Sequence, residues 1–232
     1  MILLFLNFRA NNALLLALYE NIHLNRNFVT TLAHTQNESS PPSPSNTLAH
    51  NAGHQVPDLA SAPSFLTPTN LFVAVFQYCS IVMKDHQKTE SITNLKLCLL
   101  ILTCISEDQY ANTMMHDSNL TFKVILHRAQ MRHRKLPIDK TSKPLAATLI
   151  DLLVEFIVSH MFKQKFPMEL YLLSIGIIHR LIVYQKRCRV RLNYDWKILW
   201  AALMNLLKFL VYQEQYLVKK FNIFHLAIQV CL

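Results

Sequence analysis

The chain contains 232 residues, of which 52% are hydrophobic and 16% are charged, and it carries a formal net charge of +9 at pH 7. Its only two glycines, Gly53 and Gly176, are far apart. The clustered glycines of a phosphate-binding loop or a dinucleotide fingerprint are therefore missing, and enzymes built on those motifs are excluded. The five cysteines are odd in number and form no C-x-x-C pair, which fits a reducing compartment rather than a disulfide framework.

The first 34 residues are predicted to be helical. Leu14, Leu18 and Ile22 recur at four-residue spacing, which is helical rather than strand-like, and a shorter second helix is expected from about Arg26. The composition of residues 35–66 then changes to mainly Ser, Pro, Asn, Thr, His and Ala. This segment lacks the apolar area that would offset the entropy of ordering, so we expect a long disordered Ser/Pro-rich insertion between helices.

Residues 67–232 are expected to form one helical domain. Thr67 is the predicted N-cap of its first helix. Polar and apolar residues alternate briefly in Thr121–Ile125, which is compatible with either a short strand or a helical turn. The longest uncharged runs reach only about ten residues, whereas a membrane-spanning helix needs roughly 20, so no transmembrane span is predicted. Apolar runs predict helices over Leu71–Met83, Asn94–Ile105, Glu107–Met115 and Leu145–Phe162.

The stretch Phe166–Tyr212 is predicted to form two apolar helices joined by the basic connector Gln185–Arg191. Pro167 suits a first helical turn, and Asp195 is the predicted N-cap of the second helix, where an acid lies at the positive end of the helix dipole. The second helix is apolar except for one narrow polar stripe, so we expect neighbours on several of its sides. The stripe consists of Lys197, Ala201, Asn205 and Lys208.

Two clusters of cations are the candidate sites of partner contact. Residues 121–232 contain 18 Lys and Arg against 6 Asp and Glu, whereas residues 1–120 contain 5 against 8. This asymmetry indicates an acidic partner for the second half, such as a protein surface or anionic lipid, although an ordinary solvated basic face is the alternative. No aromatic residue interleaves either cluster, which disfavours nucleic acid. The clusters are Arg128, Arg132, Arg134 and Lys135, and Lys186, Arg187, Arg189 and Arg191.

The second cluster has an alternating pattern. If it is extended, its three arginines point to one side, while Cys188, Val190 and Leu192 pack inward. Such a fork of guanidinium groups suits carboxylates or phosphates on a partner. The structural alternative is that these arginines cap the carbonyl groups at a helix C-terminus.

No catalytic, cofactor-binding or metal-ligating constellation is found in the sequence. It contains no H-E-x-x-H, no G-x-S-x-G and no Cys/His cluster with zinc spacing. Asp151 and Glu155 stand four residues apart, as paired catalytic carboxylates would. Together with Thr148 and Ser159 they also form the solvent-facing stripe expected of a surface helix, and we favour this second interpretation. A non-enzymatic protein without cofactor or metal is therefore predicted.

Long, non-repetitive segments of the chain carry a family resemblance. They include FPMELY at Phe166–Tyr171, YQKRCRVRL at Tyr184–Leu192 and NLLKFL at Asn205–Leu210. These segments resemble the armadillo-like helical domain-containing protein 3 family. That family's chain is longer at both ends, so this sequence is expected to be a fragment of its helical domain, truncated at the C-terminus. The resemblance extends, in the same order, to Leu4–Glu20, His23–Ala33, Leu102–Ala111 and Met131–Lys135.

The resemblance implies an all-α fold, an armadillo-like helical array or α-solenoid. A weak internal echo is compatible with it, since Leu149–Leu153 recurs at Leu203–Leu207, although this offset of 54 exceeds the usual repeat of about 40–47 residues. The implied function is that of a non-enzymatic scaffold, cytoplasmic and peripheral at Golgi membranes, that associates with the beta-type phosphatidylinositol 4-kinase and a large Arf exchange factor and supports Golgi maintenance and secretion. Alternatives are a peripheral module that binds anionic lipid directly through its basic half, and an unrecognised helical enzyme.

Overall fold

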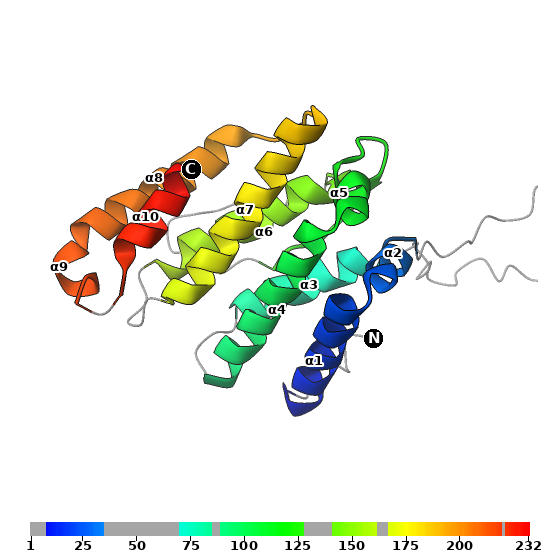
Figure 1. Cartoon of the computed structure of the whole chain (residues 1–232), viewed down its shortest axis with the longest axis horizontal. Helices are drawn as coiled ribbons and strands as arrows, with labels where there is room; N and C mark the ends of the chain where they lie inside the picture. The colour runs from blue at the N-terminus through cyan, green and yellow to red at the C-terminus, as the bar shows by residue number, and fades with distance from the viewer. Residues whose placement is uncertain (1–7, 35–69, 85–88, 128–140, 162–166, 220) are drawn as a thin grey trace, which may run out of the picture.

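The computed structural model describes residues 8–34, 70–84, 89–127, 141–161, 167–219 and 221–232. Most of these residues are helical, as predicted for an all-α protein (Figure 1). The expected insertion at residues 35–66, the Thr67 cap and the whole first cationic cluster lie outside the described residues. The helices are α1 (Phe8–Leu24), α2 (Arg26–His34), α3 (Leu71–Lys84), α4 (Thr89–Glu107), α5 (Gln109–His116), α6 (Leu145–His160), α7 (Met168–Cys188), α8 (Trp196–Tyr212), α9 (Glu214–Leu217) and α10 (Ile223–Cys231).

The helices stack in two rows (Figure 1). Helices α1, α4, α7 and α10 lie side by side in one row, and α3, α6 and α8 lie side by side in the row behind it. The rows pack on each other through the pairs α3–α4, α6–α7 and α8–α10, while the short helices α2 and α5 pack together at one edge. Because each helix packs mainly on its neighbours in the stack, the arrangement is that of an α-solenoid.

Several of the described helices begin at side chains that accept hydrogen bonds from otherwise unpaired backbone N–H groups. Asn70 Oδ1 accepts from the N–H of Phe72 at 2.8 Å and caps the described start of α3, whereas the predicted Thr67 cap lies outside the described residues. Asp195 caps α8 as predicted, since its side chain accepts from the second residue of the helix at 3.2 Å. Asp108 caps α5, which therefore begins at Gln109 and is separate from α4.

Helix α6 is the most deeply buried helix of the described stack. It lies between α3 and α8 in its own row and also packs on α5 and α7. The prediction of a solvent-facing stripe is wrong here, because Thr148 is only 5% exposed and Asp151 and Glu155 are half-buried. The Tyr171 hydroxyl of α7 donates to the carbonyl of Ile157 at 3.0 Å, and burial raises the pKa of this tyrosine well above its usual range. Periodicity identified the polar side of α6 but not what covers it.

Helix α8 is covered on one face only within the described residues. Leu199, Leu206 and Leu210 are buried, and the helix packs on α6 and α10. Trp200 and Met204, by contrast, are 56% and 47% exposed. The prediction of an inner helix with neighbours on several sides is therefore wrong for the described part of the chain.

Two short strands complete the described fold. Strand β1 (Thr121–Phe122) pairs antiparallel with β2 (Lys143–Pro144), with Thr121 opposite Pro144. This pairing confirms the strand alternative for the start of the alternating segment. The search of the described helices for one that is both long and apolar enough to cross a bilayer found none.

Candidate partner-binding site

The basic connector is helical at its start rather than extended. Helix α7 continues to Cys188, so Arg187 lies in its last turn. Arg189 follows with a positive φ of 55°, and its backbone N–H donates to the carbonyl of Gln185, which closes the helix. The predicted alternation therefore fails, and Cys188, which was expected to pack inward, is exposed. Leu192 is buried, as expected.

Arg189 holds a backbone conformation that usually favours glycine. A left-handed conformation costs a residue with a Cβ roughly 1–2 kcal/mol, and the residue just past a helix end is most often Gly for this reason. Arg189 is the only non-glycine residue with a positive φ in the described part of the chain. An arginine at this position suggests that its side chain has a role other than ending the helix.

The loop between α7 and α8 is held at three points. Leu192 inserts into the core and is 6% exposed. The Tyr194 hydroxyl donates to Asp151 Oδ1 of α6 at 3.0 Å, and the other oxygen of that carboxylate pairs with Lys143 Nζ at 3.3 Å. Asp195 then caps α8. The arginines therefore project from a backbone that the surrounding packing fixes in place.

The four cations of this second cluster share one property: they are exposed and unpaired. Within the described residues, none of them makes a side-chain hydrogen bond or an ion pair. The alternative that the arginines cap helix carbonyls therefore finds no supporting contact. These cations are Lys186, Arg187, Arg189 and Arg191, and we call them the connector cations.

The first cluster cannot be placed in the same way, although its flanks are tied to the fold. The N–H of His127 donates to Ser80 Oγ of α3 at 2.9 Å. At the other flank Lys143 is engaged by Asp151. The role predicted for Arg128, Arg132, Arg134 and Lys135 stays a prediction, because these residues lie outside the described part.

A cleft of about 400 Å³, which we call the α5–α7 cleft, opens beside the last two turns of α7. Residues of α4, α5 and α7 form its walls. Arg180 and Glu107 pair across it with a 2.8 Å contact. A Cβ at Gly176 would lie 3.2 Å from the Arg180 guanidinium, so the glycine leaves room for this side chain close to the helix. The lining includes Glu107, Asn112, Arg180, Tyr184, Arg187 and Cys188.

Buried polar groups support the α5 wall of the cleft. Asn112 Nδ2 donates to the carbonyls of Ser106 and Asp108 at 2.7 and 2.9 Å. His116 Nδ1 lies 2.8 Å from the Asn112 carbonyl, and its ring packs on that of Tyr184 with centroids 4.7 Å apart. Burial lowers the pKa of His116, so the ring is neutral at pH 7. Asn112 Oδ1 and His116 Nε2 have no hydrogen-bond partner within the described residues.

Comparison with known proteins decides the family. Armadillo-like helical domain-containing protein 3 of Danio rerio is 48% identical over 97% of this chain. The proteins of the same name from Homo sapiens and Xenopus laevis are each 46% identical over 96% of it. The chain belongs to the armadillo-like helical domain-containing protein 3 family.

The family model for armadillo-like helical domain-containing protein 3, C-terminal, matches residues 143–231, which include α6 to α10 and the connector cations. The chain spans about a third (34%) of the length of the curated relatives it matches. No solved structure matches the chain.

The sequence pointed to Arg187 in this member of the armadillo-like helical domain-containing protein 3 family, but it did not indicate the cleft beside it. The other lining residues come from separate segments of the chain, and no motif or spacing in the sequence indicated that they meet. Asp151, which was weighed with Glu155 as a paired catalytic carboxylate, stabilises the fold through its contacts with Lys143 and Tyr194. Among the described residues no group of three or more His, Cys, Asp or Glu could hold a metal ion.

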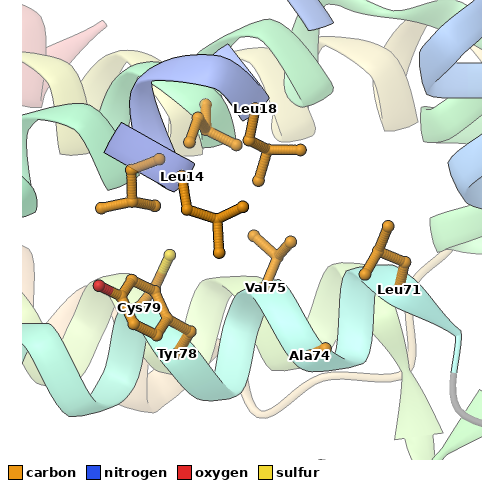
Figure 2. Close-up of a pocket in the computed structure, with 9 residues that line it drawn as sticks. Leu14, Leu18, Leu71, Ala74, Val75, Tyr78 and Cys79 are labelled. Carbon is orange, nitrogen blue, oxygen red and sulfur yellow. The ribbon is translucent and has the colours of Figure 1, made fainter. Parts of the chain in front are cut away.

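A second hollow, between α1 and α3, is apolar (Figure 2). It measures about 120 Å³, and Leu14 and Leu18 of α1 face Leu71 and Val75 of α3 across it. Cys79 also lines it, and a hydrogen bond with a neighbouring cysteine, together with burial, keeps the pKa of this thiol well above its usual range. The thiol is therefore protonated and poorly reactive. With almost no polar group to orient a ligand, the hollow has the character of a packing gap.

Proposed function

We propose that this chain is a non-enzymatic helical scaffold whose connector cations contact an acidic surface on a partner protein. The observation that carries the proposal is the set of four cations in the last turn of α7 and on the anchored loop that follows it, all of which are unpaired within the described residues. Stacked helical repeats commonly bind partners along their extended surfaces, which supports this assignment. Each charge-assisted contact contributes about 1.5–3 kcal/mol where it is sheltered from water, and less where it is exposed.

The family resemblance supplies candidate partners. They are the beta-type phosphatidylinositol 4-kinase and a large Arf guanine-nucleotide exchange factor. We place the scaffold in the cytoplasm, peripherally associated with Golgi membranes, where it supports Golgi maintenance and protein secretion. Membership of the family supports this assignment.

Charge reversal at the connector tests the proposal. Changing Arg187, Arg189 and Arg191 together to Glu is expected to abolish co-precipitation of the kinase or the exchange factor, while circular dichroism still reports a helical chain. The matched control changes three exposed lysines elsewhere, Lys197, Lys208 and Lys219, to Glu and alters the net charge equally. Equal loss of co-precipitation in both variants would show that only the overall charge matters. Full binding by the connector variant would show that these arginines do not contact the partner.

A direct contact with anionic lipid is the second candidate. The observation that favours it is the exposure of Trp200, which belongs to the cationic second half of the chain. Aromatic and basic side chains together suit a bilayer interface. Flotation with vesicles of phosphatidylcholine alone, and with added phosphatidylserine, separates the two candidates. Lipid binding predicts flotation only with the anionic vesicles, and its loss in the connector variant, whereas a purely protein-binding scaffold remains in the soluble fraction.

A further inference from the structure

The α5–α7 cleft has one cation whose charge is not compensated. Arg180 is neutralised by Glu107, with which it forms the 2.8 Å pair. Arg187, seven residues and so about two turns later on the same helix, lines the cleft and has no carboxylate partner within the described residues. The two arginines and one carboxylate leave a net positive charge in the lining. A guanidinium in this position favours a carboxylate or phosphate, to which it can donate two parallel hydrogen bonds.

The same lining also offers hydrogen-bond acceptors. Asn112 lines the cleft and is 3% exposed, and its Oδ1 has no partner within the described residues. The Glu107 carboxylate stands nearby in the same lining. Both groups accept hydrogen bonds, so a ligand that suits them carries N–H donors. A small polyanion such as sulfate has no such donors and is repelled by Glu107. A peptide supplies both backbone N–H groups and an acidic side chain.

The shape of the surface is also that of a site for a chain segment. Another hollow, of about 580 Å³ and distinct from the apolar one between α1 and α3, adjoins the cleft. Residues of α1, α2, α4 and α5 line it. The lining of the cleft contains Arg180 and Arg187, the lining of the adjoining hollow contains Asp108, and Glu107 and Gln109 belong to both. A segment of several residues can contact both linings, whereas a single small anion cannot.

We infer that the α5–α7 cleft binds an acidic peptide segment of a partner protein, with a carboxylate on Arg187 and backbone N–H groups on the acceptors of Glu107 and Asn112. The inference rests on the proposed scaffold function and makes one part of it specific. The connector cations would then differ in role, because Arg187 alone among them lines the cleft. The other three are not among its lining residues.

The test uses the 232-residue chain and two rhodamine-labelled peptides, GELEG and GKLKG, followed by fluorescence anisotropy. The acidic peptide is expected to bind and the basic peptide is not. Arg187→Gln is expected to weaken binding of GELEG by about tenfold, the lower end of the range for a charge-assisted hydrogen bond. Lys208→Gln removes the same charge from an exposed position outside both the cleft and the connector, and is expected to change the affinity little. Equal effects of the two variants, or no preference for GELEG, would overturn the assignment.

A second measurement needs no substitution. Cys188 lines the cleft and is exposed, whereas Cys231 is exposed on α10, outside it. Saturating GELEG should slow alkylation of Cys188 by iodoacetamide and leave Cys231 unaffected. Equal rates at Cys188 with and without the peptide would show that the peptide does not occupy the cleft. If these assays fail while the triple connector variant still loses its partner, only the cleft assignment falls and the scaffold proposal stands.

Discussion

Arg189→Gly separates the stability of the connector from its proposed binding role. The left-handed backbone at φ 55° costs roughly 1–2 kcal/mol with any Cβ present, and Gly removes that cost. The greater freedom of Gly in the unfolded chain cancels about 0.5–1 kcal/mol of the gain. We therefore expect a net stabilisation of about 1 kcal/mol, which raises the Tm of a chain of this size by roughly 2–4 °C. Because the guanidinium is lost, binding of the kinase or exchange factor should weaken at the same time.

Arg189→Ala is the matched control for this experiment. It removes the same guanidinium but keeps a Cβ, so its Tm should stay close to that of the parent chain while its binding falls as far as that of Arg189→Gly. Thermal melts followed by circular dichroism and co-precipitation measure the two properties. A Gly variant no more stable than the Ala variant would refute the argument from backbone strain. Undiminished binding by both variants would refute the role of the Arg189 side chain.

Three further predictions follow from buried and exposed groups. Burial lowers the pKa of His160 to about 4, below its unfolded value of about 6.5. Between pH 4 and 6.5 the unfolded chain therefore binds more protons than the folded chain. About 3 kcal/mol of stability that is present above pH 6.5 is lost as the pH falls to 4. His160→Gln removes this group and should flatten the dependence of Tm on pH. Asp151→Ala should cost about 1–3 kcal/mol in urea unfolding, because its carboxylate joins β2 and the α7–α8 loop to α6, while Glu155→Ala should cost much less. Changing Trp200 and Met204 together to Lys should reduce self-association in sedimentation velocity without loss of helicity, because it removes exposed apolar surface on α8.

Helix positions could be predicted from the sequence because their causes are local. Apolar spacing along α3 and α6 and the carboxylate before α8 act within one or two turns, and the helices begin close to the expected residues. The helix predicted over Glu107–Met115 begins two residues later as α5, and this also has a local cause, since Asp108 accepts the hydrogen bond that starts the helix. The all-α class follows from these elements together with the scarcity of glycine.

Coverage of helix faces could not be predicted, because it depends on elements that are distant in the sequence. The polar residues of α6 form a stripe, yet α3, α5, α7 and α8 surround that helix and leave Thr148 buried. The reverse holds for α8, where an apolar pattern all round the helix suggested full burial but Trp200 is exposed. A periodic pattern gives the orientation of a face and says nothing about what lies against it.

The α5–α7 cleft escaped prediction for the same reason. Glu107, Asn112 and Arg187 are far apart in sequence, and only the packing of α4, α5 and α7 brings them to one cleft. The sequence did identify Arg187, but as a member of a charge run and with the wrong backbone conformation. The end of α7 was hidden because the residue that terminates it is an arginine, whereas the usual signal for such an end is glycine.

This conflict at Arg189 connects the fold to the proposed function. In a chain whose local preferences all agreed with its fold, glycine would occupy the left-handed position after α7. The turn itself is needed, since it reverses the chain so that Leu192 reaches the core and Tyr194 reaches Asp151. An arginine there weakens the turn, and its side chain makes no hydrogen bond or ion pair within the described residues. The proposed partner contact would give this charge, which is held at a cost in stability on a loop anchored on both sides, a role that the fold itself does not supply.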